Sequence, residues 1–149
     1  MRKILSSVAL LLISHFLCAQ EKKPWNVDRL CGRLEHVHRT PERHNPNSYS
    51  EKRKALRGVS LSLFERSENE ACCNGLQAVE TTVTGRGGNF EFKTKKLGSY
   101  WLSTIWDGKN SAVPVIYERQ KNSMTVCSEQ GIQLDDHGKA EWWITVTVD

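Results

Sequence analysis

The sequence predicts an all-β protein, an antiparallel β-sandwich of seven to eight short strands that follows an N-terminal signal peptide. Three observations support this prediction. Short apolar alternations recur along the chain, turn residues stand at nearly every gap between them, and no long stretch has the 3.6-residue periodicity of an amphipathic helix. At 149 residues the chain is long enough for one domain with a substantial core.

The first 19 residues have the pattern of a secretory signal peptide. A basic start precedes a mostly apolar run over residues 4–13, and residues 16–20 form a candidate cleavage region in which we expect the cut after Ala19. The apolar run is shorter than the ~20 residues of a membrane-spanning helix, so we expect no stable membrane span. We therefore expect a secreted or periplasmic protein with a signal peptide over residues 1–19, a loose lead-in over residues 20–29 and the sandwich domain over residues 30–149.

The net charge of the expected mature chain is small. The full chain has 21 lysines and arginines against 17 aspartates and glutamates, and residues 1–19 contain two of the basic residues and no acidic one. Subtraction leaves 19 basic and 17 acidic residues, a net charge of +2. A charge this small does not produce the strong field that is typical of nucleic-acid or membrane binding.

The expected strands are short segments in which apolar or β-branched residues alternate with polar ones. Turn residues separate them, among them Asp107-Gly108 and the segments 85–89 and 135–138. The expected strands cover residues 30–37, 59–64, 78–84, 90–93, 100–106, 112–118, 124–128 and 142–148.

The alternation also predicts which side chains face the core, because successive residues of a strand point to opposite faces. By this alternation Trp106 and Trp142 point toward the core, whereas Trp101 and Trp143 point away from it. The residues expected inside are Phe90, Phe92, Tyr100, Leu102, Ile144 and Val146.

A basic insert over residues 39–57 separates the first two expected strands. It holds two prolines, many polar side chains and almost no apolar residue, so we expect a surface loop. Ser48 and Glu51 fit a capping box, and Gly58 is a typical helix stop. The end of the insert, residues 48–57, is therefore expected to coil into a short helix.

Two segments resemble a known family. Residues 88–92 (GNFEF), followed after a polar gap by residues 98–102 (GSYWL), are similar to a corner of the carboxypeptidase regulatory-like and transthyretin-like β-sandwich domains. Residues 31–34 (CGRL) and 58–63 (GVSLSL) resemble the first two strands of that family. The resemblance implies a prealbumin-like sandwich in a secreted accessory or binding module. The basic insert departs from the short loop usual in the family.

Four cysteines follow the expected signal peptide: Cys31, Cys72, Cys73 and Cys127. An even number in an exported chain predicts disulfides, and no pair has the C-x-x-C spacing of a zinc site. Four cysteines allow three pairings, and the sequence alone does not choose among them. The resemblance favours a Cys31–Cys127 bridge, which leaves the vicinal pair reduced or bridged to another chain. The competing pattern joins one vicinal cysteine to each of the other two.

His36 and His38 face the same side of an expected strand, a spacing that suits a metal site. No third ligand is evident, so we expect no metal and no other cofactor. Hydroxyisourate hydrolases are built on a transthyretin-like sandwich, but their Tyr-Arg-Gly-Ser ending has no counterpart in residues 146–149 (VTVD). No nucleophile turn of the G-x-S-x-G type is present either. We therefore expect that the protein is not an enzyme. The alternative hypothesis is a small periplasmic hydrolase.

The binding candidates are two tryptophans and two basic residues. Outward-facing Trp101 and Trp143 can stack on sugar rings or fill a partner's pocket, although a prealbumin-like topology places them in different sheets. The alternative is that neither tryptophan binds a ligand and that loops of the protein partly cover both.

Arg53 and Lys54 belong to the basic insert, which can meet an anionic surface or remain a solvated loop. Tyr49 is the only aromatic residue of the insert, so no nucleic-acid partner is expected. The expected function is a non-enzymatic binding or accessory module for a protein or glycan at the cell surface. A structural or adhesive subunit is the further alternative.

Overall fold

The computed structural model describes residues 23–67, 71–73, 75–120 and 125–145. Ten strands over these ranges form two mixed sheets, neither of which closes into a barrel. The all-β class predicted from the sequence is therefore confirmed. Helical structure in the described ranges is limited to two three-residue 3₁₀ turns, Arg86–Gly88 and Cys127–Glu129. The same ranges contain no helix long and apolar enough to span a bilayer.

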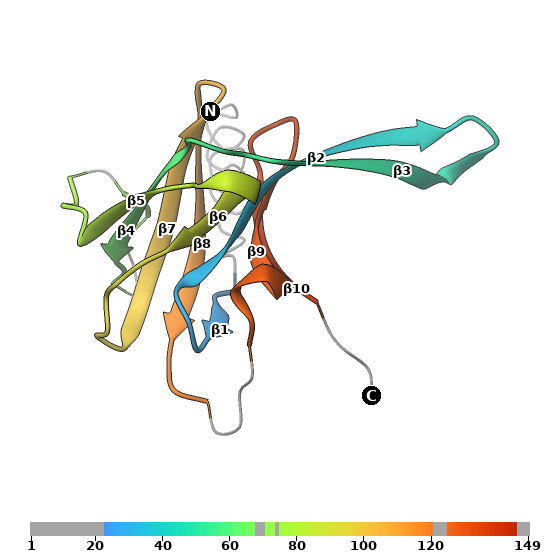
Figure 1. Ribbon diagram of the computed structural model, residues 1–149. Helices are drawn as coiled ribbons and strands as arrows, with labels where there is room; N and C mark the ends of the chain where they lie inside the picture. The colour runs from blue at the N-terminus through green and yellow to red at the C-terminus, as the bar shows by residue number, and fades with distance from the viewer. Residues whose placement is uncertain (1–22, 68–70, 74, 121–124, 146–149) are drawn as a thin grey trace, which may run out of the picture.

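The first sheet has the strand order β1-β8-β7-β4-β5 (Figure 1). Its strands are β1 (Trp25–Val27), β4 (Ser60–Glu65), β5 (Glu80–Val83), β7 (Gly98–Trp106) and β8 (Lys109–Tyr117). β1 runs parallel to β8, and the other neighbours are antiparallel. Part of the expected lead-in is thus an edge strand rather than a loose segment, because Val27 is buried in the core.

The second sheet has the order β10-β9-β2-β3, with β6 also paired to β2. Its strands are β2 (Cys31–Glu42), β3 (Asn45–Ala55), β6 (Asn89–Glu91), β9 (Gln130–Leu134) and β10 (Ala140–Ile144). β2 and β9 are parallel. The expectation of purely antiparallel sheets is therefore wrong. Each sheet contains one parallel pair between strands far apart in sequence, and alternation does not encode the direction of such a pair.

The two sheets share one apolar core. Leu34, Ile132 and Trp142 reach it from the second sheet, and Leu61 and Val113 reach it from the first.

The structure tests most of the expected core residues. Phe90, Phe92, Tyr100 and Leu102 are buried as predicted. The prediction is wrong for Ile144, which is 42% exposed. This residue ends β10, the outermost strand of its sheet. A side chain at the end of an edge strand can point toward the core side of the sheet and still lack neighbours that bury it. Val146 lies outside the described residues.

Two of the turns predicted from Asp, Asn and Gly residues have the backbone conformations that favour these residues. Asp107 and Gly108 both have positive φ, 51° and 69°, as a two-residue type I′ hairpin between β7 and β8 requires. At the corner before β6, Gly87 and Gly88 both have a φ of 76°. A Cβ on Gly88 would lie 2.5 Å from the carbonyl oxygen of Leu34, so the corner needs glycine there for space as well as for conformation.

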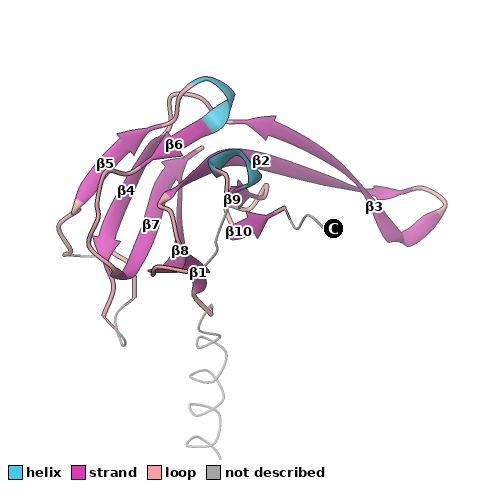
Figure 2. Cartoon of the chain, turned by 60° about the horizontal axis from the view of Figure 1, so that its bottom comes forward, coloured by secondary structure: helices cyan, strands magenta, loops and turns pink. Residues whose placement is uncertain are grey.

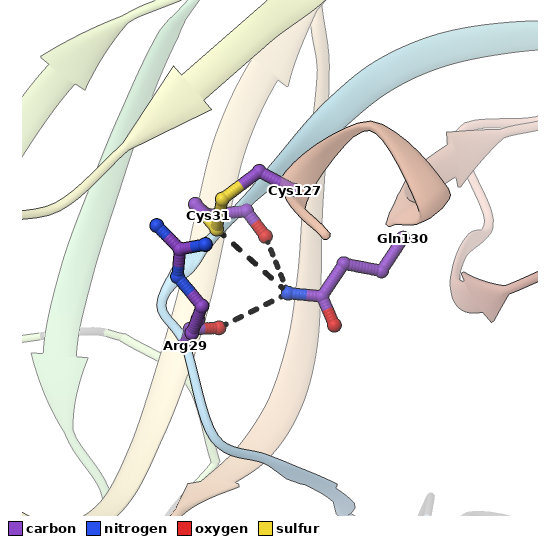
Figure 3. The surroundings of a disulfide bond; sticks show 4 residues. All are labelled: Arg29, Cys31, Cys127 and Gln130. Carbon is purple, nitrogen blue, oxygen red and sulfur yellow. Dashed lines mark hydrogen bonds between the residues drawn. A yellow bond between two sulfur atoms is a disulfide. The ribbon is translucent and has the colours of Figure 1, made fainter. Parts of the chain in front are cut away.

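The strand expected over residues 124–128 is wrong. Cys127–Glu129 is a 3₁₀ turn, and the strand follows it as β9. The sequence conceals β9 because it begins Gln130-Gly131, residues more typical of a turn. Gln130 is nevertheless only 1% exposed, since its side-chain nitrogen donates to the carbonyl oxygens of Cys31 at 2.8 Å and Arg29 at 3.2 Å (Figure 3).

The basic insert is not a surface loop, and residues 48–57 are not a helix. The insert continues β2 and β3 as a long two-stranded ribbon that projects from the rest of the protein (Figures 1 and 2). The ribbon is exposed on both faces, so it lacks the apolar alternation that marks a half-buried strand. The expected capping box does not form because Ser48 and Glu51 both lie in β3, where no helix begins. The carboxylate of Glu51 accepts from two arginine side chains instead.

Candidate functional site

The projecting ribbon is the most distinctive surface feature of the described chain. We call residues 38–54 the arm and the remaining described residues the body. In the arm, β2 and β3 pair in continuous register from His38 opposite Lys52 to Pro41 opposite Tyr49, and the register shifts after Pro41. Every arm residue is exposed except Ser48, which is partly covered. The arm therefore presents both of its faces to the surroundings.

The two faces of the arm differ in whether their charged side chains already have ion-pair partners. Opposed residues of an antiparallel pair share a face, so Lys52 lies with His38, and Lys54 lies with His36 at the root. Neither lysine has an ion-pair partner among the described residues, and we call this side the lysine face.

The opposite face carries a charged cluster that is already paired internally. Glu51 accepts from Arg39 Nε at 2.8 Å and from Arg53 Nη2 at 3.2 Å. These hydrogen bonds, the one from Arg39 first, hold the pKa of Glu51 below its ordinary value.

Arg53 connects the arm to the body. Its guanidinium lies 3.9 Å from the carboxylate of Glu35, which is only 6% exposed and also lies 3.3 Å from Arg33. Of the two basic residues predicted to bind, Arg53 is thus engaged within the protein, whereas Lys54 is free to meet a partner. A binding role for either remains a prediction.

One carboxylate holds both predicted histidines at the root of the arm. His36 Nε2 donates to Asp136 Oδ1 at 2.8 Å, and His38 Nδ1 donates to Asp136 Oδ2 at 2.5 Å. The hydrogen bond from His38, supported by that from His36, lowers the pKa of Asp136. Sequence reasoning missed Asp136, because it lies 98 residues beyond His38 in a turn that the sequence marks only as Asp-Asp-His-Gly.

The surroundings of this histidine pair come from the first sheet. The His36 ring lies 4.6 Å from the ring of Trp106 at the end of β7, and Lys109 Nζ donates to the carbonyl oxygen of Asp136 at 2.7 Å. Each histidine binds a different oxygen of the carboxylate, and the described residues contain no group of histidine, cysteine and carboxylate side chains arranged to hold a metal. The arrangement acts as a hydrogen-bonded clasp between β2 and the turn before β10.

The two predicted tryptophans lie in different sheets. Trp101 belongs to β7 and Trp143 to β10, so they do not form a joint platform. Both side chains are half-buried, and neither indole N–H has a hydrogen-bond partner within the described residues. The guanidinium of Arg66 lies 5.1 Å from the centre of the Trp101 ring, which partly covers that face.

The cysteines pair within the chain. Cys31 and Cys127 are joined, with their Cα atoms 5.3 Å apart, which is the bridge that the family resemblance favours (Figure 3). Cys72 and Cys73 are joined to each other across a cis peptide bond. The expectation of reduced or intermolecular vicinal cysteines therefore differs from the structure, and so does the competing pattern that ties the vicinal cysteines to the other two.

No family model, curated protein or solved structure matches this chain.

Proposed function

We propose that this protein is an exported, non-enzymatic binding module on a prealbumin-like β-sandwich, and that its arm holds an acidic protein partner. The observation that carries the proposal is the arm itself, which the described body leaves exposed on both faces. A two-stranded hairpin without a core is at best marginally stable in water. An arm of this length is therefore best explained by a surface that it contacts outside this chain.

The charge of the arm indicates the kind of partner. Residues 38–54 hold five lysines and arginines against two glutamates, a net charge of +3. Glu51 pairs with Arg39 and Arg53, so the cations with no ion-pair partner in the described residues include Lys52 and Lys54 on the lysine face. A partner with clustered carboxylates complements that face, whereas a base-stacking ligand would find only Tyr49.

The test is a pull-down from the exported fraction with three forms of the full chain. Lys52→Glu/Lys54→Glu reverses the charge of the lysine face, and Lys93→Glu/Lys95→Glu makes the same change in charge at exposed positions of the body. We expect the wild type and the body variant to capture the same acidic protein at low salt and the arm variant to lose it. Equal capture by all three forms, or no specific capture by the wild type, would overturn the proposal.

A small hydrolase is the second candidate, and the His36–Asp136–His38 clasp is the observation that favours it. A carboxylate that orients an imidazole is a typical part of general-base catalysis. Hydrolysis of p-nitrophenyl acetate by the wild type, lost in His38→Ala and retained in His44→Ala, would support this function. Equal rates for all three forms would exclude the clasp as the hydrolytic centre.

A further inference from the structure

A hollow lies on the face of the first sheet that points away from the core. It has a volume of about 390 Å³ and is lined by β4, β7 and β8 together with the Cys72–Cys73 pair. The volume falls at the lower end of the ~300–1,000 Å³ typical of small-molecule sites. Strand alternation explains the lining from β4, because Leu61 and Leu63 fill the core while Ser62 and Phe64, which alternate with them, face the hollow.

The polar part of the lining consists of uncharged groups. Ser60, Ser103 and Asn110 line the hollow, and their side chains make no hydrogen bond within the described residues. Ser62 shares its hydroxyl with Thr81 at 3.2 Å. None of the described lining residues is charged. A charged ligand would therefore lose hydration here without gaining an ionic partner, whereas a hydroxylated neutral ligand would find both donors and acceptors.

The apolar part of the lining lies beside these groups. Phe64, Ile105 and the joined cysteines line the hollow, and Ile105 is 68% exposed although it is a large apolar residue. Phe64 stands opposite Trp101 in the register, so an aromatic surface continues beyond the hollow on the same face. Hydroxyl partners next to aromatic and aliphatic surface are the two requirements of a sugar ring, which has hydroxyls at its edge and C–H groups on its faces.

We propose that this hollow is a binding site for a neutral saccharide of one or two rings. The hydroxyls of Ser60 and Ser103 and the amide of Asn110 bind the ring hydroxyls, and Phe64 packs against the C–H face. The site is separate from the arm and does not depend on the partner proposed for it.

Saturation-transfer NMR on the full oxidised chain tests this site with three probes: maltose, cellobiose and N,N′-diacetylchitobiose. Ala112→Phe fills the hollow from β8, and Ile116→Phe adds an aromatic ring to the same face of β8 outside the hollow. We expect at least one probe to bind the wild type and Ile116→Phe alike, and Ala112→Phe to weaken its binding by about tenfold or more.

Ser103→Ala/Asn110→Ala removes two hydrogen-bonding groups without adding volume, and we expect it to weaken the same probe by about tenfold. If circular dichroism shows that Ala112→Phe does not fold, the double alanine variant alone tests the site. No transfer to any of the three probes at about 10 mM would overturn the proposal. Unchanged binding in the folded pocket variants would overturn it equally.

Discussion

The two halves of β2 are stabilised in different ways. In the body, residues 31–37 pair with β6 and β9 as well as with β3, and Cys31, Leu34 and Val37 are each at most 1% exposed. In the arm, residues 38–42 pair with β3 alone, and every side chain is exposed. One strand thus passes from a packed core into solvent with no break in its pairing at His38.

The comparison separates backbone pairing from burial. The hydrogen-bond ladder continues along both halves, but the net stability from such bonds is only about 1 kcal/mol each. Burial supplies the larger contribution, and it ends at Val37. We therefore expect the body to unfold as one cooperative unit and the arm to open locally at a much lower free energy. Four predictions test this difference, from the largest expected effect to the smallest.

The largest effect is expected from the bridge at the start of the body half. Cys31 and Cys127 lie 96 residues apart, so their bond closes most of the domain into a loop. The chain-entropy estimate for such a loop predicts that Cys31→Ser/Cys127→Ser lowers the free energy of unfolding by ~4–5 kcal/mol. Urea unfolding followed by tryptophan fluorescence measures this loss.

Cys72→Ser/Cys73→Ser is the control, since a bond between adjacent residues closes no long loop. We expect it to cost less than about 1 kcal/mol. Non-reducing peptide mapping checks the pairing itself. Recovery of Cys72 or Cys73 linked to Cys127 would contradict both the structure and the expected difference.

The second prediction compares one aromatic residue from each region. Phe92 is 4% exposed in the core, whereas Tyr49 is 57% exposed on the arm. Phe92→Ala should lower the free energy of unfolding by about 3–5 kcal/mol through lost burial and the cavity that it leaves. Tyr49→Ala should change it by less than about 0.5 kcal/mol. Equal losses in urea unfolding would show that the arm is part of the cooperative core.

The same difference explains which parts of the structure the sequence predicts. In the body, burial imposes an alternation, so Phe90, Phe92, Tyr100 and Leu102 were placed correctly from parity alone. In the arm no face is buried, and the pattern of polar residues is the same for a loop and for a ribbon. Whether such a segment forms a strand depends on its pairing with a second segment, and the residue pattern of one segment does not show that pairing.

Long-range contacts account for the other missed features. The buried amide of Gln130 donates to the carbonyl oxygens of Arg29 and Cys31, about a hundred residues earlier in the chain. Asp136 meets His36 and His38 over a similar separation. Neither contact leaves a local pattern. The pairing of Cys31 with Cys127 was accessible only through the family resemblance, since spacing alone left three pairings open.

The third prediction concerns a carboxylate of the body. Glu80 accepts hydrogen bonds from the backbone N–H of Lys93 and Thr94 and from the Thr94 hydroxyl, at 2.6, 2.9 and 2.6 Å. Burial opposes its ionisation, but these bonds outweigh burial and lower its pKa. Because the folded pKa lies below the ordinary value of 4.5, the stabilisation is complete above that pH and is lost as the pH falls through the folded pKa.

Glu80→Gln should therefore lower the free energy of unfolding at pH 7 by roughly 1–2 kcal/mol. The difference from wild type should close as the pH is lowered below 4.5. Glu91→Gln, at an exposed position of β6, is the matched control and should change little at either pH. Urea midpoints at several pH values measure both variants. A gap that widens toward acid would contradict the assignment of these bonds to ionised Glu80.

The smallest effect on global stability is expected from the matching carboxylate of the arm. Glu51 accepts from Arg39 and Arg53, and all three side chains are exposed, so Glu51→Gln should cost less than about 0.5 kcal/mol in urea unfolding. Its effect should be local. The arm has no core to hold it, and loss of the charged acceptor should speed hydrogen exchange of arm amides by up to about twofold while amides of β7 and β8 stay unchanged.

Glu42→Gln makes the same change in charge near the tip of the arm, at a glutamate that has no ion pair within the described residues, and should leave arm exchange as in the wild type. If Glu51→Gln instead accelerated exchange in β7 and β8, the arm and body would be one cooperative unit. If it left the arm amides unchanged, the arm would be held by something other than its cross-strand charges. The first outcome would show that the arm depends on the body more than the burial boundary at Val37 implies.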